Sequence, residues 1–108
     1  MANKLTSKSI SLDGLLTIRT AATAKSQILG ALQGVQNLTI EIPPDSDADI
    51  AGIQVVLAAR NQAANESKQL SLSSPISGRF LEVMEKAGFM ECLDAGDRGF
   101  WLHDQVNK

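Results

Sequence analysis

One stretch decides the fold, and it reads Asp45-Ser46-Asp47-Ala48-Asp49-Ile50-Ala51-Gly52-Ile53-Gln54-Val55-Val56-Leu57-Ala58-Ala59-Arg60. It begins as an acidic turn and continues without a break into an apolar run. Asp49 occupies an N-cap position, where its carboxylate can accept hydrogen bonds from the backbone N–H groups of Ala51 and Gly52. A negative charge there also faces the positive end of the helix dipole. We therefore predict a helix from about residue 50 to residue 65, with an exposed N-terminus suited to function.

Length and composition place the chain among small single domains. A chain of 108 residues with 44% apolar residues can bury one core without metals or disulfides. Its single cysteine, Cys92, cannot form an intrachain disulfide and is typical of a reducing cytosol. No apolar run approaches the ~20 residues that span a bilayer, and residues 1–10 are too polar for a signal peptide. We expect a cytoplasmic protein without membrane insertion.

The charge balance argues against nucleic acid as a partner. The net charge is −2 and the ten Lys and Arg residues are scattered singly, whereas a nucleic-acid-binding domain is usually basic along one face. Aromatic residues make up only 4% of the chain, which leaves no platform for stacking bases. We expect no nucleic-acid binding.

The remaining elements follow from hydrophobic periodicity and from turn residues. Asp13-Gly14 separates two apolar runs and predicts a hairpin between strands at 5–12 and 15–19. Further elements are predicted as a helix over 22–33, a strand over 38–42 with Leu38, Ile40 and Ile42 facing the core, and a short strand at 70–72. Ser74-Pro75 predicts the start of a helix that ends at Gly88, and residues 99–102 predict a last short strand.

This order, β-β-α-β-α-β-α, predicts an α/β fold. Helices between strands imply crossover connections, so we expect a mixed β-sheet with a parallel portion and a hairpin at its edge. The strict alternation of residues 38–42 indicates that helices cover mainly one face of the sheet. Function in open α/β sheets tends to lie beyond the carboxyl ends of strands, which here points to the loop 43–49.

Two motifs carry a family resemblance. Asp49-x-Ala51-Gly52-Ile53-Gln54 at a helix start, and Ser74-Pro75-x-Ser77 before a helix that ends Met84-x-x-Ala87-Gly88-Phe89, are similar to the STAS domain (sulfate transporter and anti-sigma factor antagonist). The resemblance is strongest over 10–89, leaves 90–108 as a tail, and treats 1–108 as one domain. It implies a STAS-like mixed sheet with helices mainly on one face and a regulated protein-binding surface at the second helix.

The resemblance also implies what the chain does and what it has lost. In anti-sigma factor antagonists a serine two residues after the matching aspartate is phosphorylated by a partner kinase; here that position is Ala51, which has no hydroxyl. The chain thus resembles stand-alone bacterial signalling modules that bind a serine kinase, an anti-sigma-like protein or a chemotaxis-type protein. The alternative is a small accessory subunit of an ABC-type phospholipid transporter, docked on its cytoplasmic ATPase. Both alternatives stay open at this point.

A helical-wheel analysis adds a candidate binding strip. Ile50, Ile53, Val56, Leu57 and Ala64 fall on one side of the helix and are expected to face the core. The opposite side is small and apolar, which is consistent either with an ordinary helix surface or cover from the tail, or with a flat strip for a protein partner. With the acidic turn, the predicted partner-binding residues are Asp47, Asp49, Ala51, Gly52, Val55, Ala58 and Gln62.

Catalysis, cofactors and metals are not expected. The sequence contains no glycine-rich phosphate loop with its lysine, no clustered His and Cys ligands and no nucleophile elbow. Asp45, Asp47 and Asp49 alternate like part of a calcium loop, but no glutamate occupies the twelfth position. A solvated capping turn explains them better. We therefore expect a non-enzymatic protein with no metal site and no cofactor.

Overall fold

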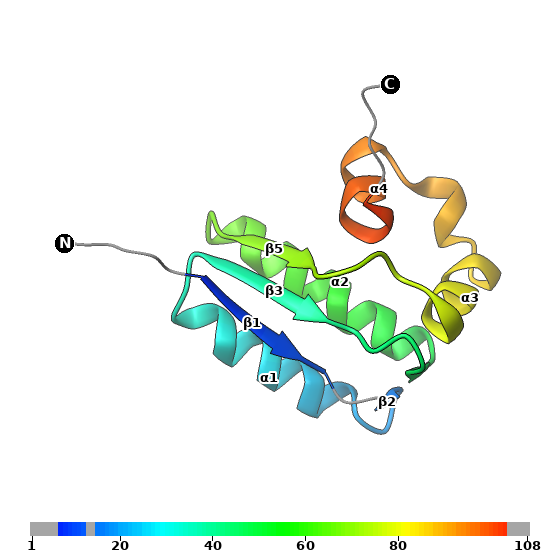
Figure 1. Cartoon of the computed structure of the whole chain (residues 1–108), viewed down its shortest axis with the longest axis horizontal. Helices are drawn as coiled ribbons and strands as arrows, with labels where there is room; N and C mark the ends of the chain where they lie inside the picture. The colour runs from blue at the N-terminus through cyan, green and yellow to red at the C-terminus, as the bar shows by residue number, and fades with distance from the viewer. Residues whose placement is uncertain (1–6, 13–14, 104–108) are drawn as a thin grey trace.

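The computed structural model describes residues 7–12 and 15–103 of the chain, in which strands and helices are interspersed (Figure 1). In chain order they are β1 (Ser7–Ser11), β2 (Leu15–Leu16), α1 (Ala21–Gln33), β3 (Asn37–Glu41), β4 (Asp47–Ala48), α2 (Ile50–Asn65), β5 (Gln69–Leu72), α3 (Gly78–Lys86), the 3-10 helix η1 (Phe89–Cys92) and α4 (Ala95–Leu102). The fold is therefore α/β, as predicted.

The central sheet has the order β1-β3-β5, and both of its strand pairs are parallel. Its register aligns Ile10 with Ile40 and Ile40 with Leu72 across the three strands. Leu38 and Ile40 are fully buried. The residues that alternate with these core residues along the three strands point to the opposite, polar face. That polar face consists of Ser7, Ser9, Ser11, Asn37, Thr39, Glu41, Gln69 and Ser71.

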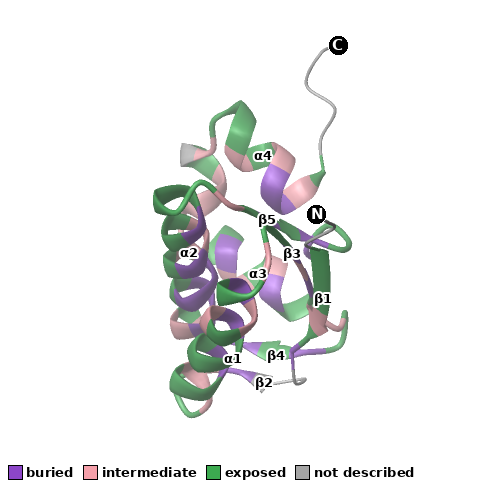
Figure 2. Cartoon of the chain, turned by 90° about the vertical axis from the view of Figure 1, so that its left-hand side faces the viewer, coloured by how far each residue is buried: buried purple, intermediate pink, exposed green. Residues whose placement is uncertain are grey.

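Helices α1 and α2 lie side by side on the apolar side of the sheet (Figure 2). Helix α1 buries Ala24, Ile28 and Leu32, which recur at the spacing of one helix face. This agrees with the expectation that helices cover mainly one face. Parallel sheets are usually covered on both faces, so the exposed polar face of this sheet is a departure from that rule. None of the helices in the described part of the chain is long and apolar enough to cross a bilayer.

The predicted hairpin is wrong, and so is the mixed sheet that it implied. The turn residues Asp13 and Gly14 lie outside the described residues, but the strands on either side of them do not pair with each other. Strand β1 pairs in parallel with β3, and β2 pairs in parallel with β4. Residues 7–11 and 15–16 thus run in the same direction as their partners, residues 37–41 and 47–48. Leu12 and Leu16 are both buried in the core, so core burial along this path outweighs the local turn signal.

The last third of the chain also differs from the prediction. Helix α3 begins at Gly78 with Ser77 as its N-cap residue, three residues after the proline that was expected to open it. Its end is as predicted, with Gly88 in the left-handed conformation at φ 83°. The predicted strand at 99–102 is instead the end of α4, whose Asp94 and Asp97 form a capping box.

Candidate protein-binding site at the start of helix α2

Asp49 joins three segments at the start of α2. Its Oδ1 accepts hydrogen bonds from Ala51 N at 2.8 Å and from Gly52 N at 3.4 Å, so the predicted N-cap is confirmed. Its Oδ2 accepts a further hydrogen bond from Ile18 N at 3.0 Å. Its own N–H donates to Leu16 O at 3.1 Å. One side chain therefore fixes both the helix start and the loop that follows β2.

Two large apolar residues next to this cap are exposed. Ile18 is 73% exposed and Ile50 is 47% exposed, and they are the exposed large hydrophobic residues among those that the structure describes. Ile18 is held by the Asp49 carboxylate, and Ile50 follows Asp49 in the sequence. Exposed apolar residues scattered singly need no explanation. Their gathering at one helix start is typical of a surface that contacts another protein.

A shallow groove adjoins these residues between α2 and α3. It encloses about 330 Å³ and is lined by Ala48, Asp49, Ile50, Arg79, Val83, Lys86 and Ala87. Its apolar floor lies between a carboxylate on one side and two cationic side chains on the other. We call the combination of this groove with Ile18, Asp47 and Ala51 the α2 N-terminal surface.

The charges of this surface are partly paired. Arg79 Nε lies 3.8 Å from Asp47 Oδ1, and Arg79 Nη1 donates to Glu82 Oε1 at 2.8 Å within α3. The hydrogen bond from Arg79 lowers the pKa of the exposed Glu82 carboxyl below its ordinary value. The acidic turn is therefore not a free negative patch, because α3 brings a positive charge to it.

The structure leaves five of the seven predicted binding residues at least partly accessible and buries the other two. Asp47, Ala58 and Gln62 are exposed, and Asp49 and Ala51 are half-buried. Gly52 and Val55 are buried, so placing Val55 on an outward strip was wrong, and the predicted binding residue Gly52 is not accessible either. Gln62 donates a side-chain hydrogen bond to Glu66 one turn further along α2. The accessible part of the predicted site is its N-terminal end, with Ala58 and Gln62 further along the helix.

The predicted outward strip is partly buried because other elements pack against α2 on more than one side. Helix α2 contacts α1, β2, β4, β5 and α3, so its buried arc is wide and turned away from the predicted one. Val56, Ala59 and Ala63 form the centre of that arc. Ile50 and Ala64, which were expected in the core, are exposed and lie outside it. Periodicity identified α2 as a helix, but it did not fix the direction of burial.

Gly52 is buried for a steric reason. A Cβ atom placed on Gly52 would lie 2.9 Å from both the carbonyl carbon and the Cβ of Leu16, and closer still to the Leu16 carbonyl oxygen. Those contacts are shorter than real Cβ atoms make, and the oxygen belongs to the backbone, which cannot move aside easily. Glycine at this position allows α2 to pack directly against β2. Its role is in the fold rather than in binding.

Ser46 does not offer an accessible hydroxyl in the acidic turn. Its side chain is 2% exposed, and its Oγ has no hydrogen-bond partner in the described part of the chain. A kinase could reach that oxygen only after the turn opened.

Sequence reasoning missed Ile18, Arg79 and Lys86 as members of this surface. Ile18 was assigned to a predicted strand over 15–19, so it was not considered as a surface residue. Arg79 and Lys86 are seven residues apart, so they fall on one face of α3. That spacing was a signal for a basic helix face, but only the fold shows that it faces Asp47 and Ile50.

Replacing Asp49 tests the double role of its carboxylate. Asp49→Ala is expected to lower the free energy of unfolding by about 2 kcal/mol, the upper end for a lost cap, because the bond to Ile18 is lost as well. Asp49→Asn keeps one acceptor oxygen, so its loss of unfolding free energy is expected to be about half as large. Urea denaturation followed by circular dichroism measures both. Equal midpoints for the two variants and the wild type would contradict the capping role.

Comparison of the chain with models of known families, with curated proteins and with solved structures finds no match in any of the three. Within residues 7–12 and 15–103, no group of three or more His, Cys, Asp or Glu side chains is placed to hold a metal ion. The functional interpretation therefore depends on the geometry described above and on the motifs of the sequence.

Proposed function

We propose that this chain is a non-catalytic regulatory module of the STAS type that binds a cytoplasmic signalling protein through its α2 N-terminal surface. The observation that carries the proposal is the gathering of the exposed Ile18 and Ile50 around the Asp49 cap. Apolar residues that a monomer leaves exposed at one place, next to a groove with charges of both signs, fit a protein partner better than a small polar substrate.

The absence of a hydroxyl at position 51 shapes the kind of regulation that we propose. Ala51 is half-buried beside the cap, and an alanine cannot carry a phosphate. Binding is therefore governed by the presence or state of the partner, such as a serine kinase, an anti-sigma-like protein or a chemotaxis-type protein. The surface behaves as a permanently unmodified docking site.

The test places a charge on the proposed surface. Ile50→Asp is expected to abolish capture of the native partner, because an unpaired charge buried in an interface costs several kcal/mol. It should leave the melting temperature nearly unchanged, since substitutions at exposed positions usually alter stability by less than about 0.5 kcal/mol. The measurement is affinity capture by the tagged chain from native lysate, with quantitative identification of the captured proteins.

A matched control separates the surface from the rest of α2. Asn61→Asp adds the same charge at an exposed position three turns further along the helix and should leave capture intact. Equal capture by the wild type and the Ile50 variant would refute the proposed surface. Capture of a transporter ATPase in place of a signalling protein would favour the accessory-subunit alternative.

A further inference from the structure

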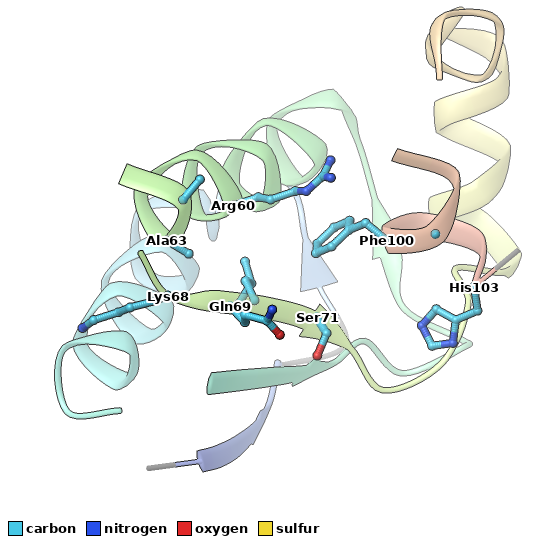
Figure 3. A pocket seen from close by; sticks show the side chains of 10 residues that line it. Arg60, Ala63, Lys68, Gln69, Ser71, Phe100 and His103 are labelled. Atoms are coloured by element: carbon cyan, nitrogen blue, oxygen red, sulfur yellow. The ribbon is translucent and has the colours of Figure 1, made fainter. Parts of the chain in front are cut away.

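A second groove lies at the opposite end of α2, beside the edge of the sheet (Figure 3). It encloses about 330 Å³ between the last two turns of α2, the strand β5 and helix α4. None of its residues belongs to the α2 N-terminal surface. We call it the β5 edge groove, and it is lined by Arg60, Ala63, Ala64, Lys68, Gln69, Leu70, Ser71, Gly99, Phe100 and His103.

The backbone of β5 presents unpaired hydrogen-bonding groups to this groove. Gln69 N donates to Gln36 O and Ser73 N donates to Ile40 O, both at 2.9 Å, so alternate residues of this segment face β3. Because successive backbone groups of a strand point to opposite sides, the N–H and C=O groups of Leu70 and Leu72 face the outer edge. No further strand pairs there in the described residues, and Leu70 lines the groove.

An open strand edge is a template for another strand. Proteins usually protect such edges with charges, prolines, bulges or a covering element. Here α4 lies beside β5 (Figure 3), but the groove keeps a gap between them at Gln69 to Ser71. An extended peptide of about four residues, roughly 13 Å long, would match the length of β5.

The lining of the groove determines the charge of that peptide. Arg60, Lys68 and His103 line it, and no acidic side chain does. Arg60 Nη1 donates to Asp97 at 2.7 Å, and Lys68 Nζ donates to Leu32 O at 2.6 Å and lies 3.3 Å from Glu66. These contacts occupy only part of the donors that a guanidinium and an ammonium carry. The Lys68 ammonium points toward α1 and away from the groove (Figure 3), so an incoming carboxylate would find its N–H donors mainly on the Arg60 guanidinium.

The Arg60 side chain is positioned by two contacts across the groove. Its guanidinium lies 4.6 Å from the centre of the Phe100 ring, and its hydrogen bond to Asp97 holds the pKa of that carboxyl below its ordinary value. Asp97 therefore stays ionised at neutral pH and Arg60 stays in place between α2 and α4. A cation fixed in this way pays little ordering entropy when it receives a ligand.

We propose that the β5 edge groove binds an extended, acidic segment of a partner protein, which adds as a strand beside β5. The outward-facing N–H and C=O groups of Leu70, which lines the groove, and of Leu72, just beyond its lining, supply backbone hydrogen bonds, and the Arg60 guanidinium receives a carboxylate side chain. This mode of recognition takes affinity from the backbone and specificity from the flanking side chains. The groove provides a second contact, separate from the α2 N-terminal surface.

The probe is a synthetic six-residue peptide of alternating valine and glutamate with blocked ends, titrated into the ¹⁵N-labelled full chain. We expect saturable shifts of the Leu70 and Leu72 amides and slower hydrogen exchange at both. A valine–lysine peptide of the same length should bind at least about tenfold more weakly, which corresponds to about 1.4 kcal/mol. The acidic peptide with every amide N-methylated should not bind, because it cannot donate to the strand edge.

Two variants of α2 complete the test. Ala64→Glu places a negative charge at an exposed position of the groove. It should lower the affinity for the acidic peptide at least about tenfold. Asn61→Glu places the same charge on α2 outside the groove and should leave affinity unchanged, and both variants should melt at the wild-type temperature. The proposal is overturned by no saturable shift at Leu70 and Leu72 up to about 5 mM peptide, or by equal binding of the N-methylated peptide. Concentration-dependent dimers that produce the same shifts without peptide would also overturn it, since the edge would then bind a second copy.

Discussion

Replacing Trp101 with alanine is expected to lower the free energy of unfolding by about 3–5 kcal/mol, the usual range for a large aromatic side chain in a core. Trp101 is 1% exposed and packs between the rings of Phe80 at 5.9 Å and Phe100 at 4.9 Å. Its carbonyl also accepts a hydrogen bond from Ile76 N at 3.0 Å. The substitution therefore removes the ring contact that joins α4 to α3, while the backbone hydrogen bond to Ile76 can remain.

The measurement needs a signal that survives the substitution. Trp101 is the sole tryptophan of the chain, so its fluorescence disappears with it and urea denaturation should be followed by far-ultraviolet circular dichroism. Trp101→Phe keeps an apolar ring and is expected to lose less than half as much stability. A denaturation midpoint for the alanine variant equal to that of the wild type would mean that α4 does not pack as part of the domain.

The elements with a strong local signal could be predicted from the sequence. Helix α1, strand β3 and helix α2 each combine a clear period with a recognisable start or stop. Asp49 identifies the start of α2, and the alternation of Leu38 and Ile40 identifies the core face of β3. In these segments local propensity and the final packing agree, so single-sequence reasoning finds them.

Strand pairing depends on contacts that no short window contains. Asp13-Gly14 is a strong hairpin signal taken by itself, yet Leu15 pairs with Asp47 and β1 pairs with β3. Helix α4 was missed for a related reason. Its sequence includes Gly96 and Gly99, which are poor helix formers, while the run Phe100 to Leu102 is too short to distinguish strand from helix. The Asp94–Asp97 capping box was the signal that could have found it.

The candidate site combines residues that the sequence singled out with residues that only the fold brings beside them. The cap and the acidic turn indicated the start of α2, and the structure keeps Asp47, Asp49 and Ala51 there. The helical wheel could not show that β2 approaches α2 closely enough to bury Gly52, or that Ile18 reaches the same place from a segment 31 residues earlier than Asp49. Those facts belong to the tertiary arrangement. They turn a predicted strip along the helix into a surface around its first turn.

The burial of Gly52 leads to a strong expectation for stability. Gly52→Ala is expected to lower the free energy of unfolding by about 3 kcal/mol, at the upper end for an overpacked core, because the new methyl group would meet the Leu16 backbone. The same Leu16 carbonyl accepts the hydrogen bond from Asp49 N, so a shift of β2 away from α2 would disturb the cap as well. Urea denaturation of the purified variant measures the loss.

Gly30→Ala provides the matched control. Gly30 lies within α1, and a Cβ atom placed on it meets nothing within 4 Å. That substitution should raise the free energy of unfolding by about 0.5–1 kcal/mol, since alanine is the better helix former. The two glycine-to-alanine changes therefore act in opposite directions in the same domain. If Gly52→Ala stabilised the chain as Gly30→Ala does, α2 and β2 would not be in direct contact, and Gly52 would return to the residues available for a partner.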